Sequence, residues 1–165
     1  MTERKKHSAE HEICFAHIEE MMPLIEESLA AGQSVKLSPT GVSMRPMLRQ
    51  ERDCVLLSPA PERLCKYDIP LYKRENGQYV LHRVVRVGKD YTCIGDNQFV
   101  YEHGIRQEQV IAVVTAFTRD EKQISVHAFS YRLYCRLWHW TRFPRHVWRA
   151  VNRRLRRFVR RMKKS

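Results

Sequence analysis

The chain has 165 residues, of which 43% are hydrophobic, which is enough for one ordinary domain with appendages. Its net charge of +12 is unevenly distributed, because residues 1–121 carry 16 Lys/Arg and 18 Asp/Glu, whereas residues 122–165 carry 14 Lys/Arg and no acid. This excludes a uniformly basic protein. The sequence has no apolar run of about 18 residues and no secretory signal, so we expect neither a membrane-spanning helix nor export.

The cysteines indicate an intracellular protein without a metal site. The chain has five of them, at irregular spacing and with no C-x-x-C pair: Cys14, Cys54, Cys65, Cys93 and Cys135. Paired zinc ligands and an even disulfide framework are therefore not expected. We predict free thiols in a reducing compartment, a cytoplasmic location, and no metal or other cofactor.

Residues 1–33 are predicted to form an N-terminal helical segment. Apolar residues recur near a 3.6-residue period between His11 and Ala31, with glutamates largely on the opposite face. Pro23 is expected to kink or split this helix, and Gly32 to end it. The segment is expected to cover the following domain, with a partner-binding or pseudo-substrate role as the alternative.

Residues 34–120 have the pattern of a mainly β domain. Short apolar runs are separated by turn signals every eight to twelve residues, at Val35–Leu37, Cys54–Leu57, Asp68–Tyr72, Tyr79–Val85, Tyr91–Ile94 and Val110–Phe117. Asn76-Gly77 is the strongest hairpin signal. The pattern predicts an all-β sandwich or a partly open barrel.

A serine turn, defined as residues 39–48, follows the first predicted strand. Gly41 permits backbone angles that other residues avoid, and Pro46 disfavours helix at Arg45. Ser43 is therefore expected on a sharp turn at a strand edge, where it would present its hydroxyl beside its own N–H. Those are the groups that a nucleophile and an oxyanion site require. By itself, the stretch is also typical of an ordinary turn.

Two later stretches change this interpretation. The predicted strand Tyr79–Val85 contains His82, a base suited to neutral pH, and a turn with the sequence Gly95-Asp96-Asn97 follows the next strand. Together the three stretches resemble the superfamily of signal peptidases I and SOS-response repressors. The resemblance covers about residues 35–114 and is closest to the histidine-type branch of the endoplasmic reticulum, archaea and sporulating bacteria.

This resemblance implies a serine endopeptidase that cleaves a leader or precursor peptide. Ser43 would be the nucleophile, His82 the base and Asp96 the carboxylate that orients it, with Glu102 as the alternative acid. Gly41 and Met44 are expected in the oxyanion or substrate-binding region. The resemblance also implies that an extended peptide pairs with sheet edges beside the serine.

Some features depart from that family, and two other functions stay open. Tyr67-Asp68 stands where the family has Gly-Asp, and Asp53 is expected to bond turn amides. The first alternative is a self-cleaving repressor-like switch, because Ala31-Gly32 is the type of dipeptide at which such proteins cut themselves. The second is a non-catalytic module that binds peptide, nucleic acid or membrane.

Residues 121–165 are predicted to form a basic, aromatic-rich helical tail. Phe129–Trp140 carries aromatics and arginines, Pro144 is expected to break the helix, and apolar residues from Trp148 to Met162 recur at helical spacing among arginines. Such a helix is typical of anionic membrane surfaces, and tryptophan favours that partner. The tail would then act at the inner face of the membrane. Nucleic acid or an acidic partner, and plain packing on the domain, are the alternatives. The oligomeric state is left open.

Overall fold

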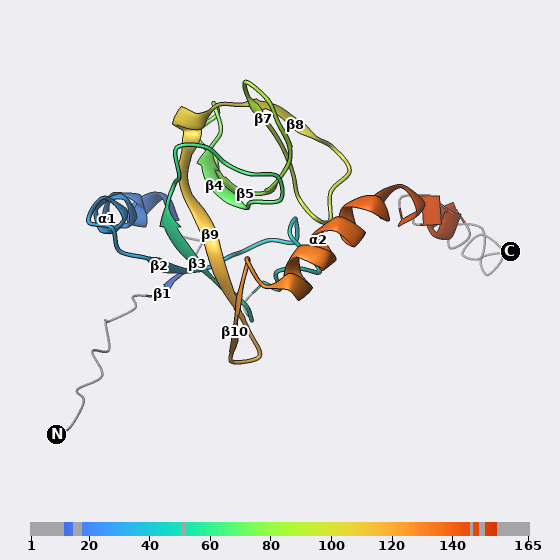
Figure 1. The fold of residues 1–165 in the computed structure, drawn as a ribbon, viewed down its shortest axis with the longest axis horizontal. Coiled ribbons are helices and arrows are strands. Elements are labelled where there is room, and N and C mark those ends of the chain that lie inside the picture. Colours follow the sequence, from blue (N-terminus) through green and yellow to red (C-terminus); the bar gives the residue numbers. More distant parts are fainter. Residues whose placement is uncertain (1–11, 15–17, 51, 146, 149–150, 155–165) are drawn as a thin grey trace, which may run out of the picture. The chain divides into compact units, whose positions relative to one another are not determined.

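A computed structural model describes residues 12–14, 18–50, 52–145, 147–148 and 151–154 (Figure 1). The elements, in chain order, are β1 (Glu12–Cys14), α1 (Ile18–Ala30), β2 (Val35–Ser38), β3 (Cys54–Pro59), β4 (Pro70–Lys73), β5 (Tyr79–Leu81), β6 (Arg83–Val87), β7 (Tyr91–Ile94), β8 (Glu102–Ile105), the short 3₁₀ helix η2 (Gln107–Gln109), β9 (Val110–Arg119), β10 (Lys122–Ser125) and α2 (Phe129–Trp140). The described part is mainly β with a few helices, as predicted.

The larger sheet is curled and, apart from the parallel β1–β2 pair, antiparallel. Within the described residues, its strand order is β1-β2-β3-β9-β4-β5, and β10 pairs with β9 beyond this path. The ten-residue β9 pairs with β3, β4 and β10. The predicted turn at Asn76-Gly77 joins β4 to β5, and Gly77 has φ 87°. This order leaves β5 at one end of the sheet.

The second sheet, of order β6-β7-β8 in the described residues, packs on the first through a buried cluster. Its members come from both sheets and from the loop before β4: Leu64, Tyr72, Val80, Val84, Tyr91, Cys93 and Ile105. The predicted strand Tyr79–Val85 is in fact two strands, because the chain leaves the large sheet after Leu81 and enters the small one at Arg83. His82 therefore lies where the two sheets meet.

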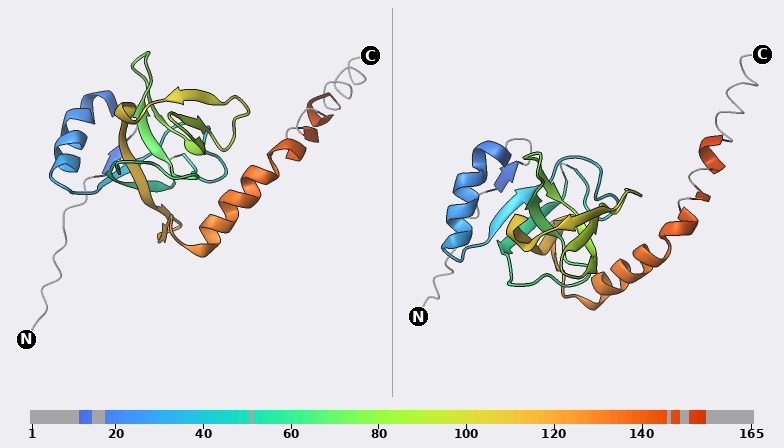
Figure 2. Two further views of the ribbon diagram at one scale, coloured as in Figure 1. Left: turned by 45° about the horizontal axis from the view of Figure 1, so that its top comes forward. Right: turned by 90° about the horizontal axis from the view of Figure 1, so that it is seen from above.

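α1 lies beside the β1–β2–β3 end of the sheet in all three views (Figures 1 and 2). It is shorter than predicted, since residues 12–14 form a strand parallel to β2. Pro23 lies inside this single helix and does not split it. Gly32, with φ 73°, ends the helix as predicted, because Gly32 N–H bonds to Leu29 O and Gln33 N–H bonds to Ser28 O.

The chain divides into two compact units, residues 1–128 and 129–165. The first unit extends past the predicted boundary at residue 120 because β10 pairs with β9. In the second unit, α2 is followed by a turn at Thr141 and by helical residues 142–145, so Pro144 lies within a helical stretch. No helix among the described residues is both long and apolar enough to cross a membrane. Cys54, Cys65, Cys93 and Cys135 are not in disulfides.

Candidate active site

The serine turn follows β2 and lies outside regular structure, as predicted. Gly41 is exposed and has φ 87°, a conformation that favours glycine. Ser43 is half-buried, whereas Met44 and Met47 are buried. The methionines fix the turn to the core, so Ser43 sits at a defined place on the surface.

The Gly95-Asp96-Asn97 stretch is clamped directly onto the serine turn. The N–H of Asn97 donates a 2.7 Å hydrogen bond to the carbonyl oxygen of Ser43, and its side-chain amide donates to Val42 O at 3.1 Å. A Cβ on Gly95 would lie 2.7 Å from Ser43 O, which is closer than side chains approach. Glycine is therefore required here for two distant stretches to touch.

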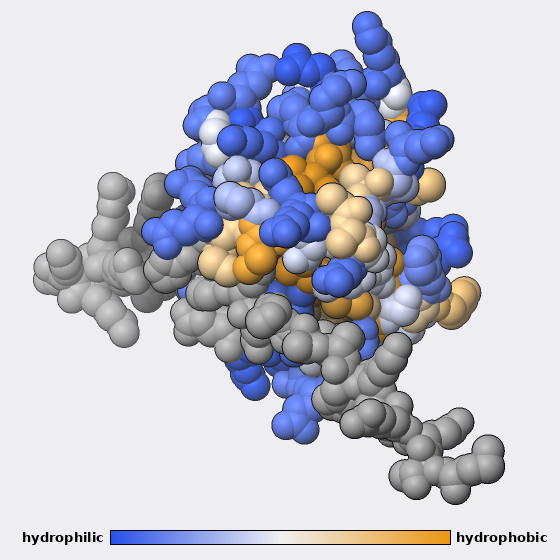
Figure 3. Space-filling model, turned by 90° about the vertical axis from the view of Figure 1, so that its left-hand side faces the viewer, coloured by the Kyte–Doolittle hydropathy of each residue, from blue (hydrophilic) through white to orange (hydrophobic). Residues whose placement is uncertain are grey.

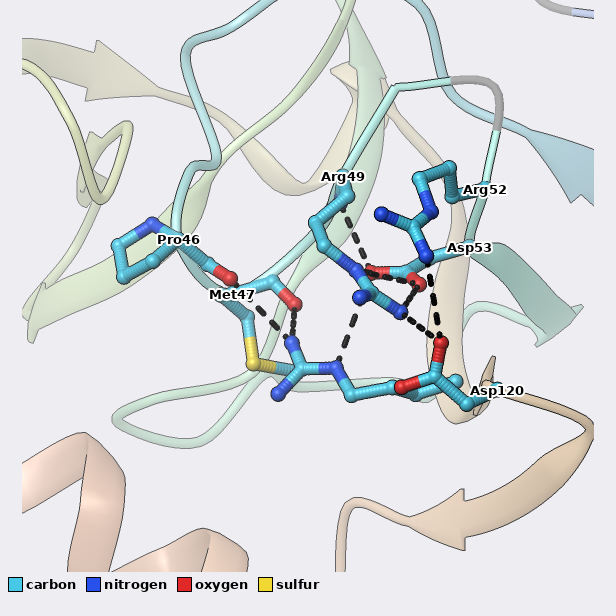
Figure 4. A network of polar contacts seen from close by, with 7 residues as sticks. Pro46, Met47, Arg49, Arg52, Asp53 and Asp120 are labelled. Atoms are coloured by element: carbon cyan, nitrogen blue, oxygen red, sulfur yellow. Dashed lines mark hydrogen bonds and ion pairs between the residues drawn. The ribbon is translucent and has the colours of Figure 1, made fainter.

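A buried carboxylate anchors the other end of the serine turn (Figure 4). Asp53 is fully buried and accepts hydrogen bonds from the backbone N–H of Arg49, at 2.9 Å, and from the Arg49 guanidinium. The predicted bonding of turn amides by Asp53 is confirmed. Arg119 donates to the carbonyl oxygens of Pro46 and Met47, and so ties the turn to the end of β9.

A carboxylate lies against Nδ1 of the His82 ring. Only 2% of His82 is exposed, and its Nδ1 lies 2.9 Å from Oε1 of Glu102, the first residue of β8. Tyr72 donates a 2.8 Å hydrogen bond to the other oxygen of Glu102. Because an ionised carboxylate only accepts, the proton of the neutral ring is on Nδ1, and Nε2 keeps its lone pair. A general base needs that tautomer.

Glu102 is kept ionised by its neighbours, and His82 is kept neutral by burial. Arg74 donates a 2.9 Å hydrogen bond from Nε to Glu102, and its terminal nitrogen bonds the second oxygen. Burial opposes ionisation of Glu102, but the hydrogen bonds from Arg74 and Tyr72 outweigh it and lower its pKa. Burial also lowers the pKa of His82, and the charge of Glu102 offsets this only in part.

Asp96, the acid expected to orient the histidine, is engaged in a buried ion pair with Arg83. The two form a bidentate contact, Nε to Oδ1 at 2.8 Å and the terminal nitrogen to Oδ2 at 2.7 Å. Arg83 also donates to Tyr67 O at 3.2 Å. Such a pair joins the start of β6 to the turn after β7. Glu102, the alternative acid, is the one that lies against Nδ1 of His82.

Ser43 and His82 line the same pocket, which has a volume of about 700 Å³. Gly41 and Met44 also line it, together with the first turn of α1 and strand β5. Figure 3 views the molecule from the side on which α1 lies in Figure 1, and hydrophobic residues gather at the centre of this face within a hydrophilic rim. The pocket lining mixes apolar side chains with polar and charged ones, and it includes a hydroxyl and an imidazole.

No hydrogen bond joins Ser43 to His82 within the described residues. The backbone N–H of Ser43 and Nε2 of His82 also make none there. Catalytic hydrogen bonds are commonly loose without substrate and tighten when it binds. The arrangement supplies a hydroxyl, an oriented imidazole and a backbone donor in one pocket.

Sequence reasoning missed two members of this site, Tyr72 and Arg74. No local signal marks either one, because the packing of one sheet on the other, and not a motif, brings them to Glu102. Tyr67 stands where the resemblance led us to expect a glycine, and it adopts φ 81°, a conformation that favours glycine. Asp68 accepts a 2.7 Å hydrogen bond from the N–H of Cys65 and holds this turn.

Comparisons with known proteins found no matching family model, no matching curated protein and no matching solved structure.

Proposed function

We propose that this chain is a serine endopeptidase of the signal peptidase-like kind, with Ser43 as nucleophile, His82 as general base and Glu102 as the acid that orients it. One observation carries the proposal. Ser43 and His82, 39 positions apart in the sequence, line one pocket, and Nδ1 of the histidine is 2.9 Å from a carboxylate oxygen of Glu102. Asp96, first expected in the third role, is assigned to holding Arg83 and the turn that clamps Ser43.

The reaction uses the groups in the order that the geometry allows. Ser43 Oγ attacks the scissile carbonyl carbon while Nε2 of His82 takes the hydroxyl proton, and Glu102 stabilises the imidazolium. The Ser43 N–H donates to the oxyanion of the tetrahedral intermediate. Collapse breaks the C–N bond, and the imidazolium gives its proton to the leaving amine. Water, deprotonated by His82, then hydrolyses the ester and restores the serine.

Peptide substrates would bind by strand addition beside the pocket. β5 pairs with β4 and ends the strand order of the large sheet in the described residues, so its other edge offers backbone groups to an extended chain. Tyr79 and Leu81 of β5 line the pocket, as does Met44. The proposed substrate is therefore an extended segment of a leader or precursor peptide.

Cleavage of a mixed peptide library, followed by mass spectrometry, tests the proposal. We expect Ser43→Ala and His82→Gln each to lower the rate about 10⁴-fold or more without a loss of fold by circular dichroism. Ser34→Ala and His103→Gln are matched controls, because both residues are exposed and lie outside the pocket lining. Full activity in either pocket variant would refute the assignment, and an inactive wild type that still binds peptides would favour a non-catalytic module.

Self-cleavage at Ala31-Gly32 is less well supported. The dipeptide lies in the cap of α1, where Ala31 N–H bonds to Glu27 O and Gly32 N–H bonds to Leu29 O. Strand addition requires an extended segment, which a helix cap is not. We therefore favour a peptide supplied by another molecule. A stable intact mass of the purified wild-type chain would agree with this.

We also propose that the chain works at the inner face of an anionic membrane. Residues 122–165 carry 14 Lys/Arg and no acidic side chain, a charge that attracts them to acidic headgroups. Binding that is lost at high salt and absent on neutral lipid supports this location. Binding to oligonucleotides alone would assign the tail to nucleic acid instead.

A further inference from the structure

The C-terminal unit exposes a row of large apolar side chains. In α2, Phe129, Leu133, Leu137 and Trp140 recur at intervals of four, four and three residues, so they share one helix face. Their exposed fractions are large, at 81%, 44%, 51% and 81%. Globular proteins rarely leave so many large apolar groups in a row open to water unless they bind something.

The row continues into the helical residues after Thr141. Backbone hydrogen bonds from Thr141 N–H to Leu137 O and from Arg145 N–H to Thr141 O connect the two stretches. Beyond Thr141 the described residues expose four more large apolar side chains: Phe143, Val147, Trp148 and Val151. We call the eight exposed residues together the apolar row.

Arginines flank the apolar row, and other groups occupy the opposite face. Arg132 and Arg136 are exposed and each immediately precedes a leucine of the row. On the opposite face, Trp138 stacks on Tyr134 at 5.7 Å between ring centroids, and the Arg145 guanidinium lies 3.2 Å from the centroid of Trp138. The helix is therefore amphipathic, with cations beside its apolar face and aromatic stacking behind it.

We infer that the apolar row inserts into the headgroup–acyl boundary of an anionic membrane, with Arg132 and Arg136 bound to lipid phosphates. The inference rests on the proposed membrane location and is independent of the Ser43 chemistry. Side chains such as Phe129 and Leu137 gain free energy only where an apolar phase receives them, which lipid offers and a phosphate backbone does not. A second copy of this helix would bring arginines against arginines.

All three tryptophans of the chain, Trp138, Trp140 and Trp148, lie in the C-terminal unit, so tryptophan fluorescence, excited at a wavelength that tyrosine does not absorb, reports on this unit alone. The experiment mixes the full chain with vesicles of phosphatidylcholine, with and without phosphatidylglycerol. We expect a blue shift and co-sedimentation with the anionic vesicles. Leu137→Glu should lower partitioning about tenfold while keeping every tryptophan. Val100→Glu is the matched control, since Val100 is 77% exposed in the other unit.

The outcomes separate the inserted face from simple charge attraction. If Leu137→Glu binds the vesicles as strongly as the wild type does, and both lose all binding at about 0.5 M salt, the insertion is refuted but the membrane location stands. No vesicle binding by the wild type would refute both. A blue shift that follows self-association in sedimentation, or one produced by an oligonucleotide without vesicles, would assign the row to another partner. Trp140→Ala, read by co-sedimentation, should repeat the loss without an added charge.

Discussion

Two carboxylate–cation groups, one buried and one partly buried, hold residues around the pocket, and they differ in whether the cation can lose its proton. Asp96 meets Arg83 in a bidentate pair in which both side chains are 2% exposed. Glu102, 19% exposed, is shared by His82, Arg74 and Tyr72. Arginine is not deprotonated in proteins, so the charges of the first group do not change with pH near neutrality. Histidine titrates near neutrality, so the second can exchange a proton.

The comparison shows that a carboxylate in a turn close to the pocket is not automatically the partner of the proposed base. Asp96 is paired with the permanent positive charge of Arg83. This pair fixes the turn in which Asn97 donates a hydrogen bond to Ser43 O. Glu102 lies 2.9 Å from Nδ1 of the imidazole and so keeps the ring proton on that nitrogen. We therefore expect changes at Asp96 to affect stability first, and changes at Glu102 to affect activity first.

Among the changes that test this comparison, Glu102→Gln has the largest expected effect on activity. The amide keeps the shape of the side chain but removes the charge that stabilises the imidazolium, so kcat/KM for peptide cleavage should fall about 10²–10⁴-fold. The free energy of unfolding should change much less, as denaturant titration would show. Near-normal activity in this variant would contradict the role of Glu102.

Asp96→Asn tests the other side of the comparison. Removing one partner leaves the Arg83 charge buried and uncompensated, which should cost about 3–5 kcal/mol of unfolding free energy. The double change Arg83→Met with Asp96→Leu should recover much of that loss, because it removes both charges. If Asp96→Asn is as stable as wild type but inactive, Asp96 belongs to the catalytic group after all.

Gly95→Ala should disturb the contact between the two stretches. The added methyl would lie 2.7 Å from Ser43 O, so the serine turn must move. We expect a loss of about 1–3 kcal/mol in stability and a larger proportional loss in kcat than in KM. Gly88→Ala is the matched control, because a Cβ there meets its nearest atom at 3.5 Å. Equal behaviour of the two variants would contradict the clamp.

The smallest expected effect is a shift in the pH dependence of kcat/KM. Burial lowers the pKa of His82 below its ordinary 6.5, so the acid limb of kcat/KM should have its midpoint below 6.5. The folded state then binds fewer protons than the unfolded state, so the contribution of His82 to stability is complete above about pH 6.5 and is lost below it. A midpoint above 6.5 would contradict a neutral, buried histidine.

Local patterns in the sequence predict the serine turn, most of the strands and the Asn76-Gly77 hairpin. They do not predict which acid meets His82, because Glu102 reaches it through the pairing of β7 with β8, in which Glu102 lies opposite Cys93. That register depends on the intervening loop and on an irregularity between Tyr91 and Cys93. β10 was missed for a related reason, since its turn uses Asp120 and Glu121 at positive φ in place of Asn-Gly.

The most direct test of the account is a pH titration of the His82 imidazole by NMR in the full-length protein, with His82→Gln to assign the signal. Glu102 raises the pKa of His82 through its charge and its hydrogen bond. We predict that Glu102→Gln lowers this pKa further and alters the Nδ1 proton signal, whereas Asp96→Asn changes both much less. A large response to Asp96→Asn with none to Glu102→Gln would contradict the assignment of Glu102 as the partner of the proposed catalytic base.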